Sequence, residues 1–227
     1  MDSTEIKKHI DAIIENTFKA LKDLYDHQQE KERDEISHYP RYSRIIFPKY
    51  SNEDTRLSEQ ELRFIFVEKF NQYCGANNLN WFYSVETPTK YKYLIKNQET
   101  PHKVQAGEKG QSAMIDFVIH NDKFERFALI EFKALNPKEA DFAKDFEKLD
   151  LEVKEEKNEI NTYFIMYVKS YKDCKNQEKN TLHSLYEKVY EAPKTKRGIG
   201  ESTTFKCYSL ETGEDITKQI ETYNQRN

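Results

Sequence analysis

Two apolar runs near the middle of the chain decide its fold. Residues 114–119 read Met-Ile-Asp-Phe-Val-Ile, and residues 127–134 read Phe-Ala-Leu-Ile-Glu-Phe-Lys-Ala. Both runs are rich in β-branched and aromatic residues, and the polar stretch 120–123 separates them, which predicts a β-hairpin. Each run nevertheless carries charge, with Asp116 in the first and Glu131 and Lys133 in the second.

Strand geometry is expected to place these three charges on one face of the sheet. Side chains alternate along a strand, so Glu131 and Lys133 share a face while Phe132 points away. With a turn centred near residues 123–124, Asp116 lies opposite Glu131, with Cβ atoms about 5 Å apart. A slip of one residue in this register would turn Asp116 to the other face.

Buried charges of this kind need partners, because desolvating a charge costs several kcal/mol or more. One divalent cation held between Asp116 and Glu131, with Lys133 beside it, explains the pattern. The alternative is a buried salt-bridge triad that has no catalytic role.

The composition excludes several classes of protein. The chain has 227 residues, of which 13% are aromatic and 33% charged, with only six Gly and six Pro, as in a globular domain with appendages. No apolar run approaches the ~20 residues of a membrane span, and the polar N-terminus does not resemble a signal peptide. Cys74, Cys174 and Cys207 are widely spaced and odd in number, which favours a reducing, cytoplasmic setting over a disulfide framework or zinc cluster. The net charge of −4 neither indicates nor excludes a nucleic-acid partner, since the local field decides.

Apolar residues recur at spacings of three and four in several segments, which predicts helices. The predicted helices cover residues 4–35, 58–74, 138–156 and 180–191. The crossover from the 127–134 strand through the third of these helices to a strand over residues 162–168 is expected to be parallel.

Three further stretches have the character of strands. Residues 81–87 predict a strand that residues 90–95 extend or pair with, and the apolar content of residues 162–168 favours a central strand. Residues 203–210 and 215–217 predict a final hairpin. The whole pattern predicts an α/β fold, in which helices flank a mixed sheet.

Asp116, followed on the next strand by Glu131-Phe132-Lys133, resembles the D…(D/E)-x-K motif of the PD-(D/E)-x-K nuclease superfamily, which has the restriction-endonuclease-like fold. The proline that usually precedes the Asp is Ile115 here. The predicted order of elements also resembles the family's αβββαβ core. The resemblance implies an N-terminal helical extension (residues 1–55), a nuclease core (56–170), and a C-terminal helix and hairpin packed on the core (171–227).

Members of this family often carry a Glu on the first core helix, facing the metal site. Leu62, Phe66 and Phe70 define the apolar face of the predicted helix over residues 58–74, and Glu59 falls within that face. Glu61 points away from it and stands three residues after Ser58, the spacing of a capping box. Glu59 is therefore predicted to be the site residue, and Glu61 a helix cap.

The resemblance implies metal-dependent hydrolysis of phosphodiester bonds. Asp116, Glu131 and the backbone carbonyl of Phe132 would hold Mg²⁺ or Mn²⁺, which prefer oxygen ligands. Lys133 would orient the attacking water or help to deprotonate it, and Glu59 could bind a second metal through water. The expected substrate is nucleic acid, DNA rather than RNA, in a restriction or phage-defence setting.

Basic residues outside the motif are candidates for phosphate contacts. They are Lys144 and Lys148 on the 138–156 helix, and Lys194, Lys196 and Arg197 in a glycine-bearing loop. A solvated helix face, with ion pairs to Asp141 and Asp145, is the alternative for the first two. A plain solvated loop is the alternative for the other three.

A homodimer is expected because two sites are needed to cut two strands, and the amphipathic N-terminal helix offers an interface. The competing interpretation is a catalytically inactive nucleic-acid-binding or interaction protein that keeps the fold and uses the charged triad structurally. Metal binding separates the two, because a salt-bridge triad takes up no Mg²⁺ or Mn²⁺.

Overall fold

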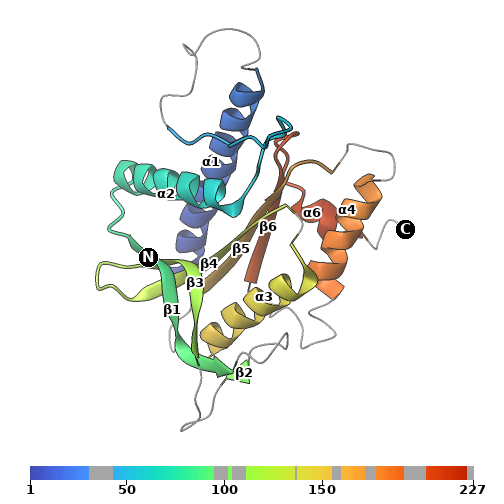
Figure 1. Cartoon of the computed structure of the whole chain (residues 1–227). Helices are drawn as coiled ribbons and strands as arrows, with labels where there is room; N and C mark the ends of the chain where they lie inside the picture. The colour runs from blue at the N-terminus through green and yellow to red at the C-terminus, as the bar shows by residue number, and fades with distance from the viewer. Residues whose placement is uncertain are drawn as a thin grey trace.

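One mixed six-stranded sheet forms the centre of the molecule. The computed structural model describes residues 1–30, 43–94, 102–103, 111–135, 137–154, 160–171, 177–191 and 203–223. The strand order is β2-β1-β3-β4-β5-β6 (Figure 1). The strands are β1 (Phe82–Leu94), β2 (His102–Lys103), β3 (Gln111–His120), β4 (Arg126–Ala134), β5 (Asn161–Val168) and β6 (Thr203–Ser209).

The predicted central hairpin is confirmed in both its strands and its register. β3 and β4 are antiparallel, and Phe117 pairs with Ile130, so Asp116 is level with Glu131. The turn is closed by the Phe124 N–H, which donates to the Asn121 carbonyl at 3.0 Å. The expected parallel crossover is also confirmed, since β4 and β5 pair in parallel and α3 lies between them in sequence.

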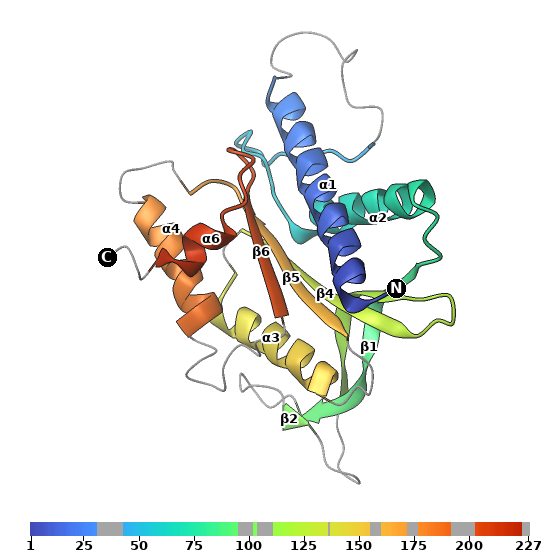
Figure 2. The same ribbon diagram turned by 180° about the vertical axis from the view of Figure 1, so that it is seen from behind.

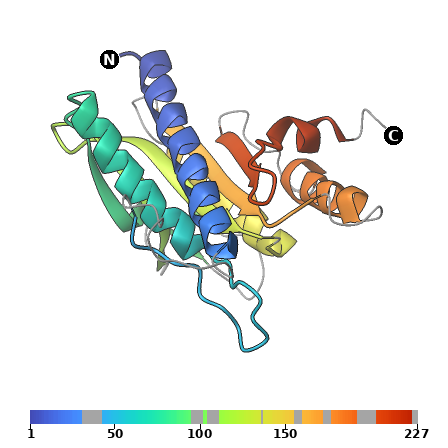
Figure 3. The ribbon, with the colours of Figure 1, turned by 90° about the horizontal axis from the view of Figure 1, so that it is seen from above.

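Helices cover both faces of the sheet, as predicted. They are α1 (Ser3–Glu30), α2 (Glu59–Ala76), α3 (Glu139–Lys154), α4 (Gln177–Tyr186) with a π-helical turn at Glu187–Glu191, and α6 (Thr217–Glu221). In Figures 2 and 3, α1 and α2 lie together on one side of the sheet, and α4 and α6 lie on the other. Within the described residues, no helix combines the length and apolar character needed to cross a membrane.

The two faces of the sheet bury separate apolar clusters. The larger cluster joins α1 and α2 to side chains such as Phe117, Ile130 and Tyr163. The other joins α3, α4 and α6 to side chains such as Phe164 and Phe205. Side chains of β5 alternate between these two clusters, and Leu129 of β4 packs in a third cluster with Leu149 of α3. Burial on both faces explains why both strands read as nearly continuous apolar runs.

The apolar stripe of α1 is not available to a second chain. Ile10, Ile13, Ile14 and Leu21 are fully buried against α2 and the sheet. The prediction that this helix supplies a dimer interface is therefore wrong for its apolar stripe, although a homodimer formed through another surface stays a prediction. Amphipathic spacing alone does not distinguish burial within a chain from burial between chains.

The predicted C-terminal hairpin is wrong in its second strand. β6 forms as expected, but after the turn only an isolated bridge joins Tyr208 to Asp215. The chain then enters α6 at Thr217, because Ile216 and Ile220 pack as one apolar face onto the cluster beneath α4. In the N-terminal half, residues 90–95 extend β1 rather than forming a separate strand, as far as the described residues reach.

Candidate active site

The two motif carboxylates lie where β3 and β4 stop pairing. Beyond the Phe117–Ile130 pair, the Phe132 N–H donates to Asp116 Oδ2 at 2.9 Å. The Asp116 N–H donates to Glu131 Oε1 at 3.4 Å. At this point side-chain oxygens replace backbone carbonyls as acceptors for the strand N–H groups. Side chains from α2 and α3, on opposite sides of the sheet, also reach the two carboxylates.

Helix α3 supplies a buried cation to Glu131. The Lys148 ammonium lies 2.6 Å from Glu131 Oε1 and 3.0 Å from Asp145 Oδ1, and it donates to the Met114 carbonyl at 2.6 Å. All three of its N–H groups therefore have acceptors. The side chain is only 5% exposed. The solvated-face interpretation is therefore wrong for Lys148 in its exposure, although the expected ion pair to Asp145 is present. The assignment of Lys148 to nucleic-acid binding stays a prediction.

Lys133 lies beside this pair and points to the same acidic group. Its Nζ is 2.7 Å from Asp145 Oδ2 and 3.9 Å from Glu59 Oε2. Burial opposes the charged form, but the nearby carboxylates, Asp145 first, raise the pKa of Lys133 above its usual value. The carboxylates around Lys133 therefore favour its charged form.

The helix carboxylate at this site is Glu59. It lines the same pocket as Asp116 and Glu131, and it lies near Lys133. Glu61 makes the predicted cap, since its Oε2 accepts from the Ser58 N–H at 2.9 Å and from Ser58 Oγ at 2.5 Å. The helical spacing predicted that Glu61 points away from the apolar face of this helix, and that detail is wrong. Glu61 is buried, because the cap holds its carboxylate against Ser58, and the Tyr167 hydroxyl donates to the carbonyl of the same serine.

Two residues that the motif does not contain complete the cluster on the α2 side. Arg63, one turn after Glu59, donates from Nη2 to Asp116 Oδ1 at 2.8 Å and from Nη1 to Glu86 Oε1 at 2.6 Å. Val85 pairs with Phe117 and Thr87 with Ile115, so Glu86 is level with Asp116 on β1. Sequence reasoning overlooked both residues, although the i, i+4 spacing of Glu59 and Arg63 was a usable signal.

The ionisation of the cluster is uneven. Burial raises the pKa of Glu131 well above the ordinary glutamate value, and Asp145 and Asp116 add to the shift while Lys148 opposes it. Burial also raises the pKa of Glu59. For Asp145, burial acts upward, but Lys148 and Lys133 outweigh it and lower the pKa. Negative charge is therefore least stabilised at Glu131.

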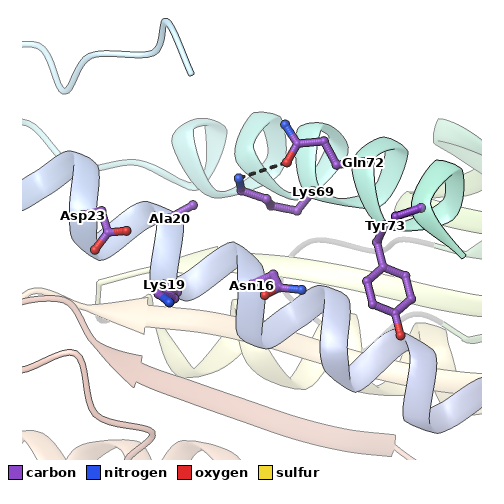
Figure 4. Close-up of a pocket in the computed structure, with 8 residues that line it drawn as sticks. Asn16, Lys19, Ala20, Asp23, Lys69, Gln72 and Tyr73 are labelled. Carbon is purple, nitrogen blue, oxygen red and sulfur yellow. Dashed lines mark hydrogen bonds between the residues drawn. The ribbon is translucent and has the colours of Figure 1, made fainter. Parts of the chain in front are cut away.

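These residues surround a polar pocket of about 340 Å³. Asp116, Glu131, Lys133 and Lys148 form its inner wall, and the exposed Lys144 lies at its rim. A larger hollow of about 470 Å³ lies between α1 and α2, where Lys69 donates to Gln72 at 3.1 Å (Figure 4). It brings no set of carboxylates together, so we place the candidate site in the smaller pocket.

The donor chemistry of the pocket fits a hard divalent cation. In the described part of the chain, no three His, Cys, Asp or Glu side chains gather closely enough to enclose an ion. Mg²⁺, however, is commonly bound through one or two carboxylates and keeps several waters. Asp116 and Glu131 provide such a pair, with Glu59 farther out on the same pocket.

Lys194, Lys196 and Arg197 lie outside the described residues, so their predicted phosphate contacts stay predictions. Comparison with known proteins gave no match, whether with family models, curated proteins or solved structures.

Proposed function

We propose that this chain is a metal-dependent nuclease of the PD-(D/E)-x-K type. The observation that carries the proposal is the meeting of Asp116 and Glu131 at the opening of β3 and β4, with Lys133 in the same pocket. The order α2, β1, β3, β4, α3, β5 supports it, since it is the αβββαβ order expected of that fold once the two-residue edge strand β2 is set aside.

The roles of the residues follow from their surroundings. Asp116 and Glu131 would hold Mg²⁺ or Mn²⁺, with the Phe132 carbonyl as a further candidate ligand. The bound ion would supply charge neutralisation at the phosphate and a hydroxide-like water at neutral pH. Lys133, held charged by Asp145, stabilises the extra negative charge that develops on the phosphate in the transition state.

Lys148 and Lys144, both candidates for phosphate contacts from the sequence, have different roles in this proposal. Lys148 fixes the Glu131 carboxylate from within the fold. Lys144 is exposed at the rim, where a backbone phosphate of the substrate can contact it. The pocket lining is charged and polar apart from Ala134 and Pro137 and contains no aromatic side chain on which a base could stack, so it suits a phosphate group better than a base. DNA, cleaved by a cytoplasmic enzyme in restriction or phage defence, remains the preferred substrate and setting.

A panel of substrates tests the proposal. Purified protein is incubated with circular duplex DNA, linear duplex DNA, single-stranded DNA and RNA, each with Mg²⁺, Mn²⁺ or EDTA. Asp116→Asn, purified in the same way, controls for contaminating nucleases. We expect cleavage that requires metal and is lost in the variant, whereas equal activity of both proteins would overturn the assignment.

One observation favours a second candidate, an inactive nucleic-acid-binding or interaction protein. Both motif carboxylates already have a cation within 2.8 Å, Arg63 on Asp116 and Lys148 on Glu131. A closed salt-bridge network of this kind needs no metal. Calorimetric titration with Mn²⁺ separates the two candidates, because only the nuclease should take up the ion.

A further inference from the structure

The guanidinium of Arg63 contacts Asp116 without itself lining the pocket. Asp116 does line the pocket. Arg63 Nη2 donates to Asp116 Oδ1, and the Phe132 N–H donates to Oδ2, so both oxygens accept a hydrogen bond from the protein. These two donors orient the Asp116 carboxylate.

Glu86 fixes Arg63 in turn. Glu86 Oε1 accepts from Arg63 Nη1 at 2.6 Å, and its side chain is 55% exposed whereas that of Arg63 is 13% exposed. The backbone of Glu86 has φ 46°, a left-handed conformation that residues with a Cβ rarely adopt. Such strained conformations concentrate at functional sites. Here the left-handed residue is level with Asp116 on the neighbouring strand.

Glu86, Arg63 and Asp116 therefore form a row of three charges of alternating sign, which we call the charge relay although nothing is transferred along it. A positive group in direct contact with a metal ligand repels the metal, and a negative group behind that positive group reduces the repulsion. Partners of this kind tune a metal ligand in addition to orienting it.

We propose that Arg63, oriented by Glu86, is a positioning residue that sets both the orientation and the cation affinity of Asp116. This inference rests on the proposed function, because it assigns a role to Arg63 only if Asp116 is a metal ligand. Arg63 holds Asp116 in its productive orientation and keeps divalent-cation binding weaker than the bare carboxylates would give. Glu86 partly offsets the charge of Arg63.

The charge relay predicts opposite effects on metal affinity from its two ends. Arg63→Met removes a positive charge next to Asp116, and we expect Mn²⁺ to bind about tenfold tighter or more. Glu86→Gln leaves the charge of Arg63 less compensated, and we expect weaker Mn²⁺ binding, by a few-fold at most because Glu86 is partly solvated. Arg63→Lys keeps the charge and should stay close to the wild type in affinity.

The matched control is Arg126→Met. Arg126 pairs with Glu152 at 3.2 Å, and its side chain is 16% exposed, close to the 13% of Arg63. The two arginines differ in their carboxylate partners, because Asp116 lines the pocket and Glu152 does not. Arg126→Met should lose stability without changing Mn²⁺ affinity. If Arg63 has only a structural role, Arg63→Met should behave in the same way as this control.

The test is a calorimetric Mn²⁺ titration of the whole chain and its variants, followed by steady-state kinetics. Tighter binding with a lower kcat in Arg63→Met, together with weaker binding in Glu86→Gln, supports the inference. Unchanged or weaker binding in Arg63→Met overturns it, and so does a shift in the same direction in both variants. If the wild type neither binds Mn²⁺ nor cleaves nucleic acid, the proposed function fails instead.

Discussion

Replacing Lys148 with methionine should destabilise the protein severely. The ammonium of Lys148 is the only described cation within 4 Å of Glu131, and its loss leaves that carboxylate, which is 1% exposed, facing Asp145 and Asp116. Removing one partner of a buried ion pair costs about 3–5 kcal/mol. For a chain of this size, such a loss lowers Tm by roughly 6–20 °C.

Urea denaturation at neutral pH measures this loss, with Lys144→Met as the control. Lys144 is exposed one turn earlier on α3, so its substitution should change the free energy of unfolding by no more than about 0.5 kcal/mol. Adding Glu131→Gln to Lys148→Met should recover much of the stability, because no charge is then stranded. If Lys148→Met unfolds at the same urea concentration as the Lys144 control, the buried ion-pair network is wrong.

The remaining predictions concern the carboxylates and Lys133. Glu131→Gln should abolish cleavage yet stabilise the metal-free protein above the usual glutamate pKa. Unlike Lys148→Met it leaves no charge without a partner, because Lys148 keeps Asp145 and the Met114 carbonyl as acceptors. The pKa of Glu131 is raised in the folded state, so the wild type loses stability as pH rises from the usual glutamate pKa through the raised one. Urea midpoints across pH check the sign, and no gain at neutral pH would contradict it. Lys133→Met should lower kcat while Mn²⁺ still binds by calorimetry, since a charged lysine cannot be a ligand, and lost binding would refute its role. Glu59→Gln should reduce activity at near-normal stability, because Glu59 lies in the pocket near Lys133. Glu61→Gln should leave activity intact, because glutamine can also serve in a capping box. Steady-state rates and melting curves check both, and lost activity in Glu61→Gln with intact activity in Glu59→Gln would contradict the assignment.

The hairpin and its register could be predicted because both depend on local rules. Alternation along a strand and a short polar turn together set which residues oppose one another, and Asp116 is level with Glu131 as expected. The capping box at Ser58 and Glu61 is likewise a local signal, and the structure confirms it, while Glu59 lines the pocket.

The partners of the carboxylates could not be predicted, because they come from helices far away in sequence. Arg63 reaches Asp116 across 53 positions. The hydrogen bond from Lys148 to the Met114 carbonyl spans 34 positions. Helical periodicity shows which face of α3 is apolar, but it does not show that Lys148 enters the opening between two strands. The same limit applies to the α1 stripe, whose burial against α2 is a tertiary property.

Binding of Mn²⁺ to the metal-free protein, followed by electron paramagnetic resonance, tests the central claim most directly. The free-ion signal reports binding without any need for a substrate. We predict that the wild type removes Mn²⁺ from solution, and that Asp116→Asn and Glu131→Gln each lose this capacity while remaining folded. Wild-type protein that binds no Mn²⁺, or variants that bind it as tightly as the wild type, would show that these carboxylates do not form a metal site.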